Sequence, residues 1–594
     1  MPKSLEVTLN SLTARSAHVT VSTPMPPPEW ALLERELIRA QTTASLAFFD
    51  RYFDERGYLK AVPHWSADDG ADDAAENLCM WPILYALGAP EDVLKIYRNG
   101  WEGHLRQYTE ARTTDVPFAR DGMYYREFPV MFDWAHNGEG FSAFFLEGLA
   151  DPYDAEFVRR TRRFAGMYMD EDPIAKNYDP KHRVVRSVMN GSRGPMLRKT
   201  TALDWAGDRF EVEGRFRPAH GERSYEQVLE HFEGYNDVIG DHPLNLGATT
   251  LAVNAYMATG EAKYRDWVLE YVDAWVERTE SNGGIIPSNI GLDGTIGGAA
   301  DGKWYGGVYG WNFTRKMPPT GELRHRPYFH SRAPWGFANA LLLTGDQRYV
   351  DVWRGVIDGV NANSKMVAGQ TMYPRMYGDE GWYAYGPERF DKGALDIYCW
   401  SGDRADLERV PEDRWVSFLE GSDPSWPVAA MREDLEVVRA KIEGVRKDMM
   451  TPDTRLSDDP NSLIATNTDT LVQVAMGGAP LGRRGFPLHC RLRYFDPGRR
   501  RPGLPEDVAA LVEGFTADET TVSLVNLDQV KGKTVVVQAG AYGEHRVVGV
   551  ALGSRTIPIE DSSFAVHLAP GCGARLVIAV DRYANQPTFA FPWV

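Results

Sequence analysis

The stretch DHPLNLGATTLAVNAYMATGEAKYRDWVLEYVDAWV, residues 241–276, predicts two helices joined by a tight turn. Residues 246–257 are small or apolar on nearly every side, so the first helix should be buried all round. Gly260 suits the left-handed position that ends a helix. In the second helix, aromatic and apolar residues from Tyr264 to Trp275 recur at helical spacing, and charged residues take the other face. We therefore expect one inner and one outer helix.

The same unit recurs along the chain. The pattern Thr-Gly-acid-x-base-Tyr stands at 259–264 and again at 344–349, and weaker copies begin at Trp81, Ala143 and Asp396. A sixth apolar segment, 466–476, follows a charged helix at 431–449. Six inner candidates with outer neighbours predict a closed ring of helical hairpins. An open solenoid is the alternative, although its repeats would be more regular and its connections shorter.

Composition excludes several classes of protein. The net charge of −18 over 594 residues argues against a nucleic-acid partner, because phosphates need a basic surface. No stretch approaches the roughly 20 apolar residues of a membrane span. The N-terminus lacks the apolar core of a signal peptide, so we expect a cytoplasmic protein. The four cysteines have no metal-ligand spacing, and neither a metal nor another cofactor is expected.

The sequence pattern changes near residue 467. Short β-branched runs between 520 and 580, separated by Asp, Gly and Lys turns, predict a small antiparallel β-sandwich. We therefore expect a mainly α protein with an N-terminal extension (1–28), a helical ring (29–478) and a C-terminal β-sandwich domain (479–594). Removing the β domain after Gly478 should leave insoluble protein, because its strands are expected to cover apolar ring surface.

Polar, titratable residues gather before the predicted inner helices. The segment 124–140 carries Asp133, His136, Asn137 and Glu139 just ahead of an apolar helix. The next inner helix opens with Asp241 and His242, and the following one opens with 324–332. The starts of four inner helices should therefore face one cavity, at Asp73, Gly138, Leu244 and Pro334.

The first entry loop, 64–73, is strongly acidic. A calcium site near Asp68–Asp73 is one interpretation, but the spacing lacks the EF-hand pattern. Acidic residues are also favoured at a helix N-terminus by the helix dipole, and contact with substrate is a third interpretation. The sequence leaves the three open.

Two long connections should overhang the mouth of the ring. Residues 177–225 are Arg-rich, and residues 282–319 are Gly-rich with a dense run of Trp and Tyr at 304–313. Aromatic faces beside carboxylates, amides and arginines suit sugar rings, which stack through their C–H faces and hydrogen-bond through their hydroxyls. The glycines match neither a dinucleotide fingerprint nor a P-loop, so a nucleotide site is rejected.

A helical ring with aromatic, His- and carboxylate-rich entry loops, followed by a β domain, resembles the (α/α)6-toroid carbohydrate-active enzymes. That group includes glycoside hydrolases and toroid-type polysaccharide lyases. The resemblance covers the architecture of most of the chain and implies an oligosaccharide or polysaccharide substrate. No specific family motif matches, so no catalytic residue is carried over from it.

Two reactions compete within that class. Hydrolysis needs a carboxylic acid and a carboxylate on opposite sides of the bond, and Glu139 with Asp241 is the expected pair, with Asp72 or Asp73 in reserve. β-Elimination on uronic-acid sugars instead needs a Tyr or His base and a group that stabilises the enediolate. A sugar isomerase or epimerase and a non-catalytic sugar-binding protein are further alternatives. The candidate catalytic residues are Glu139, Asp241, His136, His242, Tyr305 and His330, and the candidate substrate-binding residues are Asn137, Trp304, Tyr309, Trp311, Arg332 and Trp335.

Overall fold

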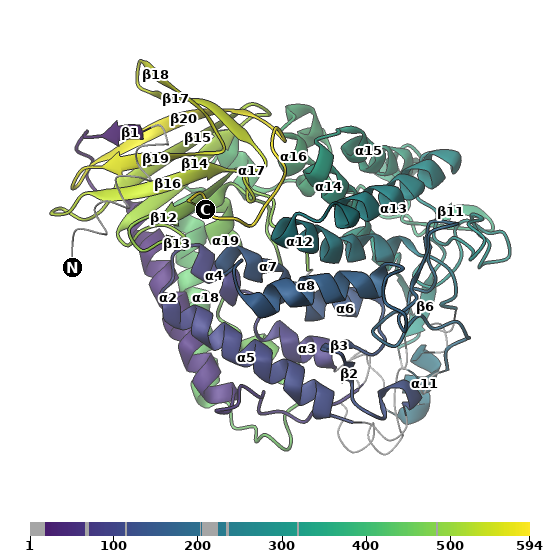
Figure 1. Cartoon of the computed structure of the whole chain (residues 1–594). Coiled ribbons are helices and arrows are strands. Elements are labelled where there is room, and N and C mark those ends of the chain that lie inside the picture. The colour runs from purple at the N-terminus through teal and green to yellow at the C-terminus, as the bar shows by residue number, and fades with distance from the viewer. Residues whose placement is uncertain are drawn as a thin grey trace.

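The computed structural model describes residues 18–65, 70–112, 116–201, 204, 224–232, 237–317, 320–482 and 485–593. Within these ranges, six inner segments alternate along the chain with six outer helices (Figure 1). The outer helices are α2 (Glu29–Tyr52), α5 (Glu91–Glu110), α8 (Ala155–Tyr168), α13 (Ala262–Ser281), α15 (Arg348–Asn361) and α18 (Trp426–Lys447).

The inner segments are short helices, several of them broken near their N-terminal ends. They are α3 (Ala71–Glu76) with α4 (Trp81–Ala86), α6 (Trp134–Gly140) with α7 (Ser142–Ala150), η3 (Pro243–Ala248) with α12 (Thr249–Thr259), α14 (Ala333–Thr344), α16 (Ala394–Ser401), and α19 (Asp469–Leu471) with η7 (Val472–Met476).

The ring is closed, because the last outer helix, α18, packs along the first, α2. An ion pair between Arg432 and Glu29 joins the same two helices. The predicted helical ring is thus confirmed over the open solenoid.

The hairpin at 241–276 has the predicted form. Every residue of α12 from Thr249 to Met257 is buried, and Gly260 ends the helix with a left-handed φ of 71°. Helix α13 buries one face only, where Trp267 and Tyr271 stack with ring centroids 5.6 Å apart. The inner helix is therefore buried on all sides and the outer one is amphipathic.

The C-terminal part is a sandwich of two five-stranded sheets. One sheet has the order β1-β19-β16-β12-β13 and the other β14-β15-β20-β17-β18. Buried Val537 and Phe564 of the first sheet, with Leu524 and Ile578 of the second, belong to the continuous core. The strands are β1 (His18–Val21), β12 (Leu492–Asp496), β13 (Arg501–Pro502), β14 (Val508–Phe515), β15 (Glu519–Asn526), β16 (Lys533–Ala539), β17 (Arg546–Leu552), β18 (Arg555–Asp561), β19 (Ser563–Leu568) and β20 (Gly573–Asp581).

The N-terminal segment contributes to this sandwich. Strand β1 pairs in parallel with β19, placing His18 opposite Ala565 and Val21 opposite Leu568. The chain therefore begins, in its described part, on the β domain before entering the ring.

The β domain covers the C-terminal ends of the inner helices, which we call the capped end. The Arg493 guanidinium donates to the Leu149 carbonyl at the end of α7. Arg582 donates to the carbonyls of Trp400 and Ser401 at the end of α16. Carbonyls at a helix C-terminus carry partial negative charge, so arginine is favoured there.

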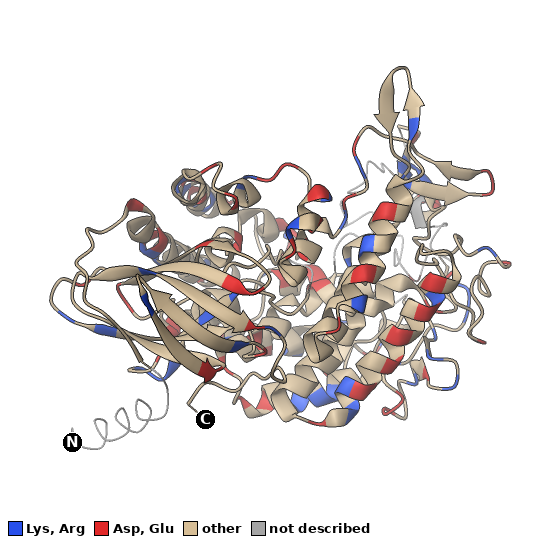
Figure 2. Ribbon diagram, turned by 90° about the horizontal axis from the view of Figure 1, so that it is seen from above, with Lys and Arg blue, Asp and Glu red and all other residues tan. Residues whose placement is uncertain are grey.

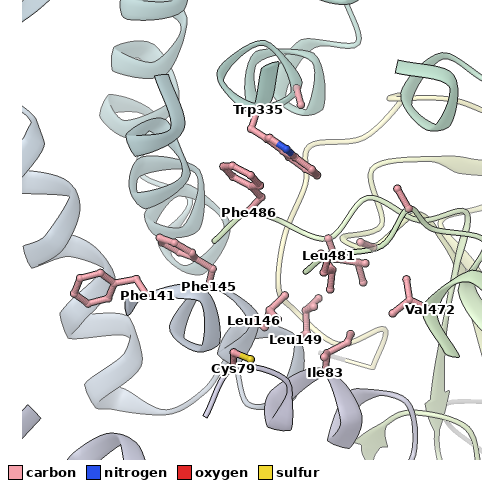
Figure 3. Packing of buried hydrophobic residues seen from close by; sticks show 14 of the residues in the cluster. Cys79, Ile83, Phe141, Phe145, Leu146, Leu149, Trp335, Val472, Leu481 and Phe486 are labelled. Atoms are coloured by element: carbon pink, nitrogen blue, oxygen red, sulfur yellow. The ribbon is translucent and has the colours of Figure 1, made fainter. Parts of the chain in front are cut away.

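Phe486, which follows the ring and precedes the β domain, packs into the ring interior. Phe486 stacks on Trp335 of α14 with ring centroids 4.4 Å apart, and it lies in one cluster with Phe145 and Leu481 (Figure 3). Gly485 has a φ of 72°, and a Cβ there would fall 2.0 Å from the Gly138 carbonyl oxygen. Only glycine permits this approach to α6.

Short hairpins and helices lie in the connections between the inner and outer helices of the ring. The remaining strands are β2 (Tyr124–Tyr125), β3 (Phe128–Pro129), β4 (Tyr178–Asp179), β5 (Val184–Val185), β6 (Thr314–Met317), β7 (Glu322–His325), β8 (Lys365–Val367), β9 (Gln370–Met372), β10 (Met376–Gly378) and β11 (Gly381–Tyr383). The remaining helices are η1 (Pro117–Ala119), α11 (Tyr225–Phe232), η4 (Tyr328–Ser331), η5 (Arg404–Glu408), α17 (Arg414–Leu419) and η6 (Asp459–Leu463).

Acidic and basic side chains are interspersed along the outer helices (Figure 2). Many form ion pairs across the surface, such as Arg348 with Asp273 at 2.7 Å. Among the residues described, none of the helices combines the length and the apolar composition needed to cross a membrane.

Candidate active site

The N-terminal ends of four inner segments lie side by side at one end of the ring, which we call the mouth. Segment α3 contacts α6, α6 contacts η3, and η3 contacts α14. Asp72, Asp133, His136, Glu139 and Arg332 from these segments form what we call the carboxylate cluster, because their charges and hydrogen bonds connect them. Gly140 allows α3 and α6 to approach, since a Cβ there would lie 3.3 Å from the Asp72 Cα.

Asp133 and His136 form the buried base of the cluster. Asp133 caps α6, and its Oδ1 accepts hydrogen bonds from the His136 backbone N–H at 3.1 Å and from its Nδ1 at 2.7 Å. Its Oδ2 accepts from the Tyr309 hydroxyl at 3.0 Å. Burial alone would lower the pKa of His136, but the Asp133 charge and hydrogen bond outweigh it and raise that pKa to about 10. His136 is therefore an imidazolium at neutral pH.

Asp72 is a buried carboxyl group of the cluster whose pKa is raised. Burial raises the pKa of this carboxyl to about 7, the His136 charge opposes the rise, and the Glu139 charge adds to it. The side chain sits near Tyr124, whose hydroxyl is 2.7 Å from the His104 Nε2. A large fraction of Asp72 thus remains a neutral acid at pH 7, where an exposed aspartate would be ionised.

Glu139 and Arg332 form the outer part of the cluster. The Arg332 Nη2 donates to the Glu139 Oε1, and its Nη1 donates to the Ser331 hydroxyl at 3.0 Å. The Glu139 side chain is 23% exposed, whereas that of Arg332 is 6% exposed. The carboxylate is therefore held in place from the buried side while one face stays open to solvent.

Asp241 lies at the mouth but turns away from the cluster. Its carboxylate accepts from the Tyr271 hydroxyl at 3.0 Å, the Asn245 amide at 2.9 Å and the Val185 backbone N–H at 3.0 Å. Burial raises the pKa of Asp241 to about 6, opposed by the Arg278 charge and by these hydrogen bonds. Its contacts join the inner segment to the outer helix α13 and to the loop at Val185, as expected of a structural carboxylate.

His242 and His330 are both neutral. The His242 Nδ1 accepts from the Leu244 backbone N–H at 3.2 Å, and burial lowers the pKa of the ring to about 3. His242 packs edge-on against Tyr309, so it lies at the same end of the ring as His136. His330 packs on Phe390 at 6.1 Å, and burial together with the nearby Lys392 lowers its pKa to about 3.

Tyr305 lies outside the cluster, on an exposed loop where its hydroxyl donates to Asp379 at 2.7 Å. Some of the expected sugar-binding residues contact the cluster and others lie elsewhere. Tyr309 and Arg332 contact the cluster, whereas Trp304 packs at a tilt against Tyr377, with ring centroids 4.7 Å apart, beside Tyr305. Three others are buried in structural contacts: the Asn137 amide donates to the Asn190 carbonyl at 3.1 Å, the Trp311 indole to the Ile286 carbonyl at 2.8 Å, and Trp335 packs on Phe486.

Among the described residues, no group of three or more His, Cys, Asp or Glu side chains is arranged to hold a metal ion. The possible calcium loop falls partly on 66–69, which lie outside the described residues. Asp73 accepts a hydrogen bond from the Gly70 backbone N–H at 2.8 Å, which is the capping role favoured at a helix N-terminus.

The family model of DUF8034, a domain of unknown function, matches residues 18–390. Among curated proteins, none matches the chain. Among solved structures, an inactive variant of the α-1,6-mannanase of Salegentibacter sp. HEL1_6 in complex with α-1,6-mannotriose is similar at 10% identity and a TM-score of 0.30, covering 73% of this chain and 97% of that one. Cellobiose 2-epimerase from Bacillus thermoamylovorans is similar at 12% identity and a TM-score of 0.26, covering 64% of this chain and 100% of that one.

Proposed function

This chain belongs to the DUF8034 family, and we propose that it hydrolyses glycosidic bonds of an oligosaccharide, with Asp72 as general acid and Glu139 as the second carboxylate. The observation that carries the proposal is the contrast between these two carboxyl groups. Asp72 is buried and has its pKa raised to about 7, whereas Glu139 is partly exposed and ion-paired with Arg332. Two carboxyl groups in such different environments are the arrangement that acid and base catalysis at a glycosidic bond requires.

Each group has a distinct role in the proposed reaction. Asp72 gives its proton to the leaving glycosidic oxygen as the bond to the anomeric carbon breaks. Glu139 takes a proton from the attacking water, whose oxygen forms the new bond to that carbon. The imidazolium of His136, fixed by Asp133, and the guanidinium of Arg332 are positioning residues that hold the two carboxyl groups and balance their charge.

The geometry gives less support to β-elimination. His136 is already protonated, so it has no free site for a substrate proton on the nitrogen held by Asp133. Tyr309 donates its hydroxyl hydrogen to Asp133, and Tyr305 donates its hydroxyl hydrogen to Asp379, outside the cluster. Hydrolysis therefore makes better use of the groups that meet at the mouth.

Substitution of the two carboxyl groups tests the proposal. Asp72→Asn and Glu139→Gln should each lower turnover by more than ~100-fold on a cleaved substrate, as expected for loss of a positioned acid or base. Asp241→Asn is the matched control, because it alters another buried carboxyl at an inner-helix start that turns away from the cluster. It should affect stability more than the turnover of folded enzyme.

The assay should follow a panel of neutral and uronic-acid oligosaccharides by new reducing ends and by ultraviolet absorbance of a new C=C bond. Hydrolysis gives reducing ends without that absorbance. New absorbance would instead indicate elimination, and turnover retained by both Asp72→Asn and Glu139→Gln would remove these residues from catalysis.

A further inference from the structure

A polar and aromatic cavity lies outside the carboxylate cluster. Its volume is about 520 Å3, and it is formed where the loop 303–313 meets the β10–β11 hairpin. We call it the hairpin cavity. The side chains that line it include Lys303, Asn312, Asp379, Glu380, Trp382 and Tyr383.

Hydrogen bonds join the polar groups of the hairpin cavity to one another. The Lys303 ammonium donates to both Asp379 oxygens, at 2.7 and 2.9 Å, and the Tyr305 hydroxyl donates to the same carboxylate at 2.7 Å. Hydrogen bonding from Lys303 lowers the pKa of Asp379, so this exposed group stays ionised. Such an arrangement offers donors and acceptors to hydroxyl groups without ordering long side chains first.

Aromatic contacts support Trp382, the one tryptophan in the lining of the hairpin cavity. The Trp382 ring lies 5.1 Å from Tyr377 and 5.8 Å from Trp311, in edge-to-face contacts. Tyr377 also donates its backbone N–H to the Trp311 carbonyl at 2.8 Å, which ties the hairpin to the loop. Trp382 is therefore presented on a rigid support, partly exposed at the cavity wall.

The loop 303–313 connects the hairpin cavity directly to the carboxylate cluster. Tyr309 contacts Asp133 in the cluster, and Asn312, three residues further on, lines the cavity. Three residues of chain span at most roughly 11 Å between their Cα atoms. One short oligosaccharide could therefore occupy both places.

We propose that the hairpin cavity is a distal subsite that binds neutral sugar units of the same oligosaccharide whose bond is cleaved at the carboxylate cluster. A tryptophan face with an amide, a carboxylate and an ammonium matches the C–H face and hydroxyls of a hexose. Asp379 and Glu380 outnumber the single Lys303, which is already paired, so a chain of uronic acids is repelled. This inference rests on the proposed function and adds the charge and the length of the substrate.

The test measures oligosaccharide binding by the full chain carrying Asp72→Asn, so that no cleavage occurs. The ligands are neutral gluco- and manno-oligosaccharides, from disaccharide to hexasaccharide, with oligogalacturonates of the same lengths. Affinity should rise with length for the neutral series, and Trp382→Ala should remove that rise, weakening the long ligands roughly tenfold, as is typical for loss of a buried tryptophan contact. Trp382→Phe should retain most of the rise in affinity with ligand length.

Tyr385→Ala is the matched control, since Tyr385 is a partly exposed aromatic residue two positions beyond the cavity lining that packs on Lys365. It should leave binding unchanged. The inference is overturned if Trp382→Ala weakens all lengths equally or none, if uronates bind better than neutral ligands, or if no neutral ligand binds. Failure of the proposed function would appear differently, as turnover that Asp72→Asn leaves intact while length-dependent binding persists.

Discussion

Buried arginines lie at both ends of the inner helices, but they have different partners at each end. At the capped end, Arg493 is 1% exposed and donates hydrogen bonds to the carbonyls of Leu149 and Ala541. At the mouth, Arg332 holds a carboxylate that keeps one face in solvent. The capped end pairs arginines with the carbonyls of helix C-termini, whereas the mouth brings several charged side chains close to one another.

This difference distinguishes a buried arginine with a structural role from a buried carboxyl that is a candidate for catalysis. A buried charge that pairs with backbone stabilises the fold, and its removal leaves unsatisfied groups. A buried carboxyl such as Asp72, whose ionised form is disfavoured by its surroundings, opposes stability at neutral pH. Perturbed groups of the second kind concentrate at functional sites.

Removal of the whole β domain after Gly478 is expected to have the largest effect. The cut exposes the C-terminal ends of α7 and α16 and the apolar surface around Trp335, so soluble protein should be lost. Expression and sedimentation of the fragment ending there check this. A soluble, active fragment would show that the ring does not need the β domain to cover this end.

Arg493→Ala should come next. The Leu149 carbonyl loses the Arg493 donor, the Ala541 carbonyl keeps only Gln538, and a cavity opens, so the free energy of unfolding should fall by about 2–4 kcal/mol. Denaturant unfolding measures it, with Arg575→Ala on the exposed face of the same domain as control, expected to change stability by less than ~1 kcal/mol. Turnover per folded molecule should be retained, and its loss would contradict the division between the two ends.

Asp72→Asn should change stability in the opposite direction, and only at pH values where an ordinary aspartate is ionised. The pKa of Asp72 is about 7 in the folded chain against 3.8 in the unfolded chain, so the native state binds more protons between these values and loses stability as pH rises through them. The amide side chain of the variant does not titrate, so the variant does not lose stability in this pH range. The melting temperature should therefore rise by a few degrees at pH 8 and stay near wild type at about pH 4. A lower melting temperature at pH 8 would make Asp72 a structural carboxylate.

The ring was predictable because its signals are local and repeated. The spacing in 241–276 and the recurrence of Thr-Gly-acid-x-base-Tyr mark inner and outer helices without any long-range information. The position of β1 was not predictable, because its pairing with β19 joins residues at opposite ends of the chain.

The candidate site was only partly predictable for a related reason. The sequence singled out the mouth and its loops, but not which carboxylates face each other. Asp241 and Asp72 both start inner helices, and only the contacts of Asp241 with Tyr271 and Val185 distinguish them. Similarly, Arg332 and Glu139 pair across 193 residues of sequence, a separation over which no local pattern operates.

The pH dependence of kcat/KM for the wild-type enzyme on a cleaved neutral oligosaccharide tests the central claim most directly. Because Asp72 must be protonated to act as the acid, activity should fall as pH rises, with an apparent pKa near 7. The fall should be absent from the binding of the same ligand. A profile that stays flat between about pH 6 and pH 9 would contradict the assignment of Asp72 as general acid.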